Sequence, residues 1–322
     1  MLTRALAICL CTTAAVAAEV GGVASYPARP IRLIIGQAPG GGLDITARAL
    51  AQKMGESFGQ SVVADNRAGA AGTLGSAMVA KAAPDGYTVL IVSVTYSINP
   101  SLYHKLPFDP RKDLQPVTLA ASTPFLLLIN PALPVKTVRE LIAHAKEKPG
   151  QLNYGSGGLG NSGHLAAELF SNMAGVRLMH IPYKGTGPAM TDVLSGQLQL
   201  MFNSMIQGMP YVKSRRLAAL AVTTARRASA MPELPTIAES GLPGYDFSSW
   251  YGLMVPAGTP RVIVNRLHGE VVQALSQADF RRRLAQEGSD PIGSTPAQFA
   301  AHLTAEIVKW EKAVRDSGMR VE

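Results

Sequence analysis

The sequence predicts an α/β protein with two similar lobes, each a mostly parallel sheet flanked by helices. Short apolar runs alternate with helical patterns along most of the 322 residues, and this alternation is typical of right-handed βαβ units. A strand, a glycine loop and a helix follow one another at residues 31–58, and the same unit recurs at 152–174. The chain leaves the first set near Pro124 and returns near Trp250, so we expect two crossing strands to form a hinge.

The first unit is the stretch around which we expect a binding site. Residues 31–35 are branched, apolar and bounded by turn residues, which indicates a strand buried on both faces. Gly40, Gly41 and Gly42 then remove every Cβ from the turn, so backbone amides can approach a ligand closely. Asp44 stands where a helix N-cap is expected. Free amides at a helix start favour an anion, although a tight turn without a ligand fits this loop equally well.

The rest of the first lobe adds two strands and a polar edge. Residues 62–64 predict a strand, and residues 66–72 are a second small-residue loop before an alanine-rich helix. Residues 88–93 predict another buried strand. Ligands of parallel sheets bind beyond the carboxyl ends of the strands, so we expect the polar residues after this strand to share a cleft with the glycine loop. These residues are Thr95, Tyr96 and Ser97.

The second lobe repeats the pattern. Residues 126–129 predict its first strand, and residues 137–148 predict a helix that opens with a Thr-x-x-Glu capping box. A strand at 152–154 leads into a glycine-rich loop and a further helix. The candidate binding residues of this loop and helix start are Ser156, Gly157, Gly160, Asn161, Ser162 and His164.

Three more strands complete the second lobe, at 178–181, 198–202 and 217–222. Between the first two, Gly185 and Thr186 lie in a turn before a short helix, and we include both among the candidate ligand contacts. The turn follows the carboxyl end of a strand, where ligands of parallel sheets bind.

The chain then returns to the first lobe. Residues 232–244 are rich in Pro and Gly and predict a connector, and residues 250–255 predict a returning strand. We therefore assign residues 26–124 together with 250–322 to lobe 1, and residues 125–249 to lobe 2. The last helices are predicted at 262–277, 278–286 and 296–317.

Residues 1–18 predict a secretory signal peptide that is not part of the fold. They contain Arg4, an apolar run and small residues at a cleavage site, and the run is too short for a membrane span. Both cysteines, Cys9 and Cys11, lie in this segment. A lipid anchor is disfavoured, because a bulky residue precedes each cysteine. The mature chain would then lack thiols for disulfides, thiolate metal sites or a cysteine nucleophile, which suits a periplasmic protein.

Composition and motifs argue against nucleic-acid binding and against catalysis. The net charge is +8, but no aromatic residues interleave with the basic pairs as in a nucleic-acid groove. The six histidines show no metal-ligand spacing, and no glycine run ends in the Lys-Ser or Lys-Thr of a P-loop. Ser162 lacks the G-x-S-x-G context of a nucleophile elbow. We therefore expect no catalytic residue, no metal and no cofactor.

One motif matches a dinucleotide-binding fingerprint. Residues 155–160 and 158–163 both fit G-x-G-x-x-G and lie between a predicted strand and a helix. The next strand ends at Ile181 and is followed by Pro-Tyr-Lys, with no acidic residue to bind a ribose. A dinucleotide-binding oxidoreductase, or another secreted α/β enzyme, therefore stays the alternative to a binding protein.

Seven short motifs occur in one order along the chain. They are Y-P-A-R-P-I-R from Tyr26, A-P-G-G-G-L-D from Ala38, N-R-A-G-A-A-G from Asn66, P-D-G-Y from Pro84, P-Y-K-G from Pro182, L-P-T-I-A-E from Leu234 and P-A-G-T-P from Pro256. In these motifs the chain resembles the solute receptors of the tripartite tricarboxylate transporters, the Bug or citrate-receptor-like periplasmic binding proteins. The resemblance implies a two-lobed type II periplasmic binding fold that closes on a carboxylate. We expect a monomer that delivers its ligand to membrane transporter subunits.

The resemblance also implies binding roles for residues 38–44 and 156–162, whose amides and hydroxyls would hold the ligand. Gln37 stands where an aromatic or apolar residue is usual, and Asn203 stands where many relatives carry Asp. Without that acid, we expect ligands with an ammonium group to bind poorly, because nothing offsets the desolvation of the charge. Dicarboxylates, tricarboxylates, acidic amino acids and aromatic acids are all ligands of the family, and some members serve sensing instead of transport, so these alternatives stay open.

Overall fold

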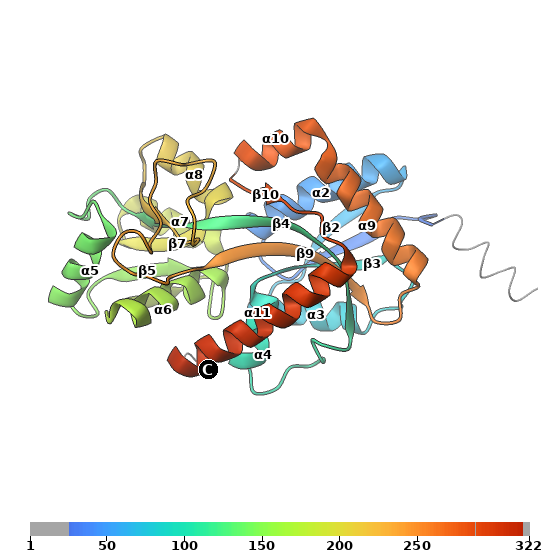
Figure 1. Cartoon of the computed structure of the whole chain (residues 1–322), viewed down its shortest axis with the longest axis horizontal. Helices are drawn as coiled ribbons and strands as arrows, with labels where there is room; N and C mark the ends of the chain where they lie inside the picture. Colours follow the sequence, from blue (N-terminus) through green and yellow to red (C-terminus); the bar gives the residue numbers. More distant parts are fainter. Residues whose placement is uncertain (1–25, 287, 318–322) are drawn as a thin grey trace, which may run out of the picture.

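The computed structural model describes residues 26–286 and 288–317; the predicted signal peptide lies outside them. Within these residues, one mixed sheet of ten strands runs through the molecule (Figure 1). The strands are β1 (Ile31–Ile35), β2 (Val62–Asn66), β3 (Thr88–Ser93), β4 (Leu114–Ile129), β5 (Asn153–Ser156), β6 (Met179–Pro182), β7 (Leu200–Ser204), β8 (Ala218–Val222), β9 (Ser248–Pro256) and β10 (Asp290–Pro291). Their order is β2-β1-β3-β9-β4-β7-β5-β6, and β8 and β10 also pair with β4.

The helices gather around the two ends of the sheet (Figure 1). They are α2 (Gly42–Phe58), the 3₁₀ turn η1 (Ala70–Gly72), α3 (Thr73–Ala80), α4 (Thr95–Leu102), α5 (Val138–Glu147), α6 (Ser162–Ala174), α7 (Thr186–Ser195), α8 (Met205–Lys213), α9 (Arg261–Ser276), α10 (Ala278–Gln286) and α11 (Pro296–Ser317). None of the helices in the described part of the chain is both long and apolar enough to cross a bilayer.

Each end of the sheet contains the predicted parallel strands. At one end β1 pairs in parallel with β2 and β3, and at the other β5 pairs in parallel with β6 and β7. Helices α5 to α8 surround the second set, whereas α2, α3 and α9 to α11 surround the first (Figure 1). The predicted α/β class is therefore confirmed, with strand–helix units in both halves.

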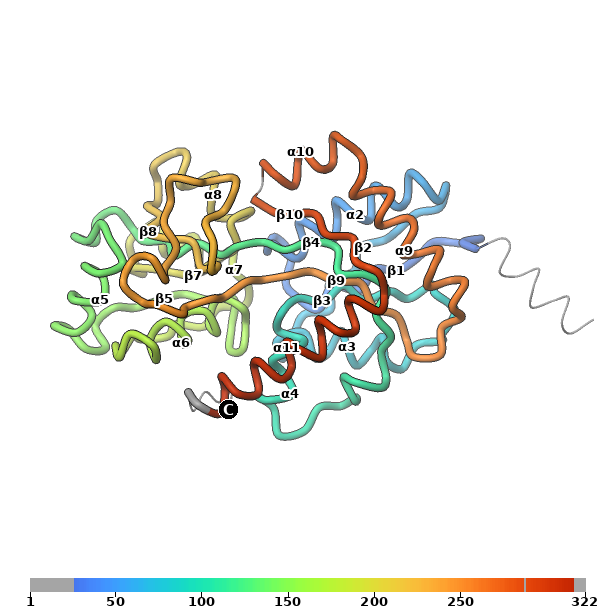
Figure 2. The backbone as a smooth tube through the Cα atoms, viewed as in Figure 1, coloured from blue at the N-terminus to red at the C-terminus, as the bar shows by residue number. Residues whose placement is uncertain are grey.

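Two long strands join the halves. Residues 114–124 of the 16-residue strand β4 pair antiparallel with β9, and residues 125–129 pair antiparallel with β7. Figure 2 shows β4 and β9 running side by side through the middle of the molecule. Two crossing strands thus connect the halves, as the sequence predicts.

β4 begins earlier than the predicted start at residue 126. Pro116 and Pro124 lie within it, and proline argues against a strand because it cannot donate to the ladder. The register with β9 shifts between Pro116 and Thr118 and again between Leu119 and Ala121. These irregularities accommodate a proline in a strand that the sequence pattern does not reveal.

Two helix starts also differ from the predictions. α2 begins at Gly42 with Gly41 as its N-cap residue, so Asp44 lies in the first helical turn and the N-cap prediction is wrong. α4 begins at Thr95, where the sequence indicates only a polar strand end; Pro100 inside this helix conceals it, because proline disfavours helix interiors. Thr137 is confirmed as the N-cap of α5, since its Oγ1 accepts a hydrogen bond from Glu140 N–H at 3.1 Å. The reciprocal bond of a capping box differs, because Glu140 Oε2 accepts from Lys136 N–H at 2.6 Å.

Helix α11 is anchored on the crossing strand β9. The indole nitrogens of Trp250 on β9 and Trp310 on α11 both donate to Glu306 Oε2 at 3.1 Å. Phe299 at the start of α11 is fully buried and packs against Gly252 of β9 so closely that a Cβ at Gly252 would collide with the ring. Because residue 252 has no side chain, Phe299 and α11 can pack this closely against β9.

We predict that Gly252→Ala destabilises the protein by about 1–3 kcal/mol, because the added methyl group forces the Phe299 ring and α11 away from β9. Urea denaturation measures the change. The control is Gly269→Ala on α9, where a Cβ would meet nothing within 4 Å; there we expect no loss, because alanine favours a helix over glycine. Equal stability of the two variants would contradict this packing.

Candidate functional site

A cavity of about 700 Å³ lies between the two halves of the molecule. One half supplies Gly36, Gln37, Ala38, Gly41, the loop 68–72, Thr95 and Tyr103. The other half supplies the following lining residues, all from the loops after β5 and β6: Gly157, Gly158, Leu159, Asn161, Pro182, Tyr183, Lys184, Gly185 and Thr186. Both predicted glycine loops therefore meet one cavity at the carboxyl ends of parallel strands.

The two halves approach each other closely at this cavity. A Cβ added at Gly185 would lie 3.0 Å from Ala38 Cβ, and one added at Gly41 would lie 3.4 Å from Thr186 Oγ1. At each approach a glycine of one half therefore faces a small side chain of the other half, Ala38 or Thr186. Amide groups on both sides can reach a small ligand held there.

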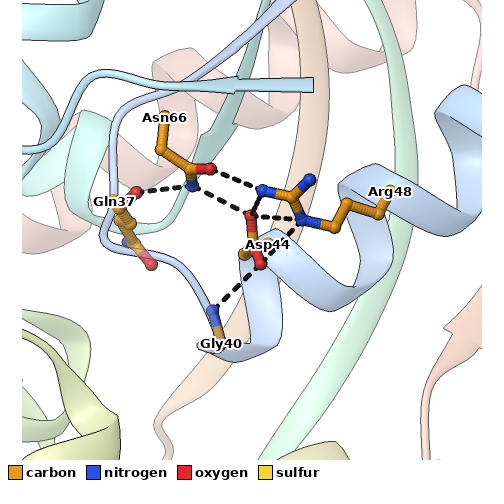
Figure 3. A network of polar contacts seen from close by, with 5 residues as sticks. All are labelled: Gln37, Gly40, Asp44, Arg48 and Asn66. Carbon is orange, nitrogen blue, oxygen red and sulfur yellow. Dashed lines mark hydrogen bonds and ion pairs between the residues drawn. The ribbon is translucent and has the colours of Figure 1, made fainter. Parts of the chain in front are cut away.

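The first loop (residues 36–41) is fixed by a polar network behind it (Figure 3). Asp44 Oδ2 accepts the N–H of Gly40 at 2.9 Å, and both Asp44 oxygens accept from Arg48 Nε at 3.0 Å. Asn66 Nδ2 donates to Asp44 Oδ1 at 2.9 Å and to the carbonyl oxygen of Gln37 at 3.0 Å. Arg48 Nη2 also donates to Asn66 Oδ1 at 2.6 Å. The loop is thus held at both of its ends, Gln37 and Gly40.

The network keeps the Asp44 carboxylate ionised although the residue is only 4% exposed. Burial by itself raises the pKa of Asp44, but hydrogen bonds from Arg48, Gly40 and Asn66 outweigh it and lower the pKa below its usual value. The carboxylate oxygens of Asp44 are therefore bonded to internal partners. The side of the loop that faces the cavity thus carries no exposed negative charge from Asp44.

The second loop (residues 155–163) is held by neutral groups. Ser156 Oγ accepts from Gly158 N–H at 3.1 Å and donates to Gly158 O at 3.0 Å. Asn161 Oδ1 caps α6 by accepting from Gly163 N–H at 2.9 Å. Gly158 and Gly160 have φ of +122° and +70°, which side chains other than hydrogen rarely tolerate. Glycine at these two positions therefore allows the loop to turn toward the cavity.

Seven of the predicted site residues line the cavity directly. They are Ala38, Gly41, Thr95, Gly157, Asn161, Gly185 and Thr186. Thr186 Oγ1 is buried there without a hydrogen-bond partner. An unpartnered buried hydroxyl is costly, so this oxygen is available to a ligand.

Other predicted residues lie behind the lining and support it. Gly40 and Asp44 bond to each other, and Ser156 bonds to Gly158. The N–H of Gly160 donates to His164 Nδ1 at 3.2 Å. Ser162, in the first turn of α6, is 4% exposed and is not among the lining residues.

Gly42 and Asn203 lie away from the cavity lining. A Cβ at Gly42 would come within 2.5 Å of Ser204 Oγ and 2.6 Å of Tyr251 Oη, so this glycine allows the start of α2 to pack against the start of α8. Asn203 is 2% exposed; its amide donates to Gln207 Oε1 at 2.8 Å, and its oxygen accepts from Ser204 N–H at 2.9 Å. Both side-chain groups of Asn203 are thus satisfied within the protein.

Tyr96 and Ser97 point into the core, contrary to the prediction that they face the cleft. Tyr96 Oη donates to the carbonyl of Pro110 at 2.7 Å, and Ser97 Oγ donates to the carbonyl of Val94 at 2.7 Å. Both residues belong to the first turn of α4, and a helical turn directs successive side chains around its axis. Thr95 alone of the three reaches the cavity.

Several lining residues were not predicted. Ala70 and Ala71 have φ of +46° and +51°, a conformation that costs non-glycine residues about 1–3 kcal/mol each and is common at functional sites. Tyr103 and Leu159 add apolar surface, and Lys184 is the one charged side chain among the lining residues that the structure describes. The P-Y-K-G motif contains Lys184, but spacing alone gives no reason to select it.

The cavity offers hydrogen-bond donors and no catalytic arrangement that we can identify. Among residues 26–286 and 288–317, no cluster of His, Cys, Asp or Glu could hold a metal ion. The lining carries no carboxylate and no histidine within that part of the chain. Its amides, hydroxyls and lysine suit a bound anion.

Comparisons with known proteins extend these observations. The model of the tripartite tricarboxylate transporter family receptor matches residues 46–319. Protein BugT of Bordetella pertussis is 36% identical over 325 residues, which cover 100% of this chain and 99% of BugT. The structure of R. palustris Rpa4515 with adipate has a TM-score of 0.88 and 37% identity, covering 91% of this chain and 98% of that chain.

The periplasmic binding protein BugD is similar over a comparable length. Its structure has a TM-score of 0.87 and 32% identity, covering 92% of this chain and 99% of that chain. This similarity extends over both halves and the crossing strands, so it confirms the two-lobed periplasmic binding fold.

We predict that Gly41→Val weakens ligand binding at least tenfold, about 1.4 kcal/mol, because its side chain would fill the space between the loops. Gly41 has φ −80° and ψ 167°, an extended conformation that valine adopts readily, so the melting temperature should stay nearly unchanged. Gly269→Val on the exposed surface of α9 is the control. Unchanged affinity of the Gly41→Val protein would count against the loop as a binding element.

We also predict that Asp44→Asn destabilises the protein by about 1–2 kcal/mol at neutral pH, because hydrogen bonds to a charged group are lost. The folded pKa of Asp44 lies below its unfolded value of about 3.9. Its contribution is therefore complete above the unfolded pKa and is lost as pH falls through the folded pKa.

Urea denaturation of both proteins from neutral pH to about pH 3 should thus show a stability difference that shrinks on acidification. Glu56→Gln, at a surface ion pair with 54% of the Glu56 side chain exposed, should change stability by less than about 1 kcal/mol at any pH. A difference between wild type and Asp44→Asn that is independent of pH would contradict the role of the ionised carboxylate.

Proposed function

Because the chain belongs to the tripartite tricarboxylate transporter receptor family, we propose that it is a periplasmic receptor that closes on a small carboxylate and presents it to transporter subunits in the membrane. Residues 26–124 and 250–322 would form one lobe and residues 125–249 the other. The receptor would act as a monomer, would be exported by the signal peptide at residues 1–18, and would bind its ligand without turnover.

The observation that carries the proposal is the meeting of two side-chain-poor loops across one cavity. Gly185 faces Ala38 and Gly41 faces Thr186 at close range, and Gly157, Gly158, Leu159 and Asn161 complete the same lining. Backbone N–H groups at helix starts favour an anion, and α2, α6 and α7 all begin in or beside these loops. Lys184 adds a positive charge at the rim.

The lining also supports an apolar body on the ligand. Leu159 is 48% exposed although it lies on the cavity wall, and Ala70, Ala71 and Tyr103 provide further apolar surface. A volume of about 700 Å³ is within the roughly 300–1,000 Å³ typical of pockets for drug-sized ligands. Rpa4515, at 37% identity, is described with adipate, a straight-chain dicarboxylate. A carboxylate with a hydrocarbon chain or ring fits this surface better than a small hydroxy acid.

A calorimetric panel of adipate, benzoate, succinate and aspartate tests the proposal. We predict that adipate or benzoate binds tightest, and that aspartate binds at least tenfold more weakly than succinate, because no lining carboxylate offsets the desolvation of its ammonium group. Trp250 lies on the crossing strand β9, and its indole shares the acceptor Glu306 Oε2 with the indole of Trp310 on α11. Intrinsic fluorescence should therefore change when the lobes close.

If none of the four carboxylates in the panel binds, the receptor proposal is contradicted. Uptake of NAD⁺ in the same assay would instead support the dinucleotide-binding alternative. Tighter binding of aspartate than of succinate would refute the expected discrimination against an ammonium group and leave the receptor role standing.

A further inference from the structure

Three aromatic rings lie together behind the second loop. The rings of His164 on α6 and His180 on β6 are 4.2 Å apart at an interplanar angle of 22°. The ring of Tyr154 on β5 lies 4.8 Å from His180 at 19°. His164 and Tyr154 are buried, and none of the three is among the residues that line the cavity. These rings support the site without forming its surface.

The two imidazoles are bonded to opposite ends of the loop. His180 Nε2 and Ser156 Oγ are 2.7 Å apart, and His164 Nδ1 accepts the N–H of Gly160 at 3.2 Å. The residues between these two points include Gly157, which lines the cavity. The segment between Ser156 and Gly160 is therefore held by a hydrogen bond to His180 at its start and by one to His164 at its end.

We propose that His164 and His180 are positioning residues that hold the second loop in the shape that binds ligand, and that His164 does so as a neutral imidazole. This inference rests on the proposed function of the cavity. It assigns to both histidines a role that is neither catalytic nor direct contact with the ligand.

The geometry fixes the protonation state that this role needs. A backbone N–H can only donate, so Nδ1 of His164 must carry no proton. The remaining proton is then on Nε2, which lies 4.0 Å from Glu168 Oε1. A second proton, on Nδ1, would place two donors against each other at Gly160. Protonation of His164 would therefore release the loop at this point.

The surroundings of the rings favour the neutral form. Burial lowers the pKa of His164 to about 4, and burial together with the neighbouring His164 lowers the pKa of His180 to about 4. The other titratable groups that face the rings are Glu168 of α6, which raises the pKa of His180 but not enough to offset burial, and Tyr154 of β5, whose hydroxyl donates to Glu168 Oε1 at 2.6 Å. The loop itself, residues 155–163, contains no titratable side chain.

The lowered pKa of His164 determines the direction in which stability of the held loop changes with pH. In a released loop Nδ1 of His164 is free to take a proton, and we expect His164 to regain the ordinary pKa of about 6.5. Since the held state has the lower pKa, its stability relative to the released state is complete above about pH 6.5 and is lost as pH falls toward 4. Between about pH 7.5 and 5.5 the titration of His164 should cost the held state about tenfold in its equilibrium with the released one.

Amide hydrogen exchange by NMR, with matched variants of His164, tests the proposal. His164→Asn keeps an oxygen acceptor near the position of Nδ1 and cannot be charged, whereas His164→Leu keeps volume without an acceptor. His144→Asn, on α5 of the same half, is the control. The readouts are the protection factor of the Gly160 amide at about pH 7.5 and 5.5 and the affinity for adipate.

We predict that the protection of Gly160 in the wild type and in His144→Asn falls by up to about tenfold between the two pH values, because His164 takes up a proton on release. In His164→Asn it should stay nearly constant, because asparagine does not titrate. His164→Leu should lose most protection at both pH values and bind adipate at least tenfold more weakly, whereas His164→Asn should bind within about threefold of wild type.

Two results would overturn the proposal. The first is that His164→Leu protects the Gly160 amide and binds adipate as well as the wild type does. The second is that protection of Gly160 falls with pH by the same factor in His164→Asn as in the wild type. This second comparison tests the proposal even if His164→Leu does not fold. If the wild type does not bind adipate, the exchange data still test the positioning role, so failure of the receptor proposal is distinguishable from failure of this one.

Discussion

The constraint on which this structure depends is that the loops lining the cavity from both halves consist largely of glycine and other small residues. Bare backbone can approach an anion closely, but a glycine loop is also the most flexible kind of segment and loses the most conformational freedom on becoming ordered. Its shape must therefore be set by groups outside it. Preorganised donors bind better than donors that must be ordered by the ligand, so the residues behind the loops matter as much as those that face the cavity.

The two halves meet this constraint with different chemistry. The first loop is held by the ionised Asp44, whose charge is balanced by Arg48 and shared with Asn66 and Gly40. The second is held by groups that bear no net charge, among them His164 and Ser156. A carboxylate beside an anion site would ordinarily repel the ligand. Here its oxygens are directed at internal donors, and Arg48 offsets its charge.

One continuous sheet joins the two halves. β4 pairs with β9 in one half and with β7 in the other, so hydrogen-bonded strands connect the halves. Glycine also permits contact between the halves away from the cavity: Gly288 packs against Met205 with no room for a Cβ. Small residues therefore occur both where the ligand is expected and where the lobes touch.

Much of the architecture could be predicted from the sequence, because strand–glycine loop–helix units and buried strands have strong local signatures. The cavity was placed at the correct strand ends for the same reason. Local patterns could not reveal that Tyr96 and Ser97 begin a helix containing Pro100, nor that the loop at Ala70 and Ala71 adopts left-handed backbone beside the cavity. Local patterns also gave no reason to place His180 beside Ser156, because this contact depends on β6 lying beside β5, a long-range pairing that no local spacing encodes.

The central claim is that main-chain N–H groups from both lobes donate hydrogen bonds to one bound carboxylate. The most direct measurement is a titration of ¹⁵N-labelled protein with adipate, followed by amide shifts in NMR spectra. The account predicts downfield proton shifts for the lining amides of Ala38 and Gly41 in the first loop and of Gly157 and Leu159 in the second, with one shared dissociation constant. Shifts confined to one loop, or a response of the Lys184 side chain without any change in these amides, would contradict it.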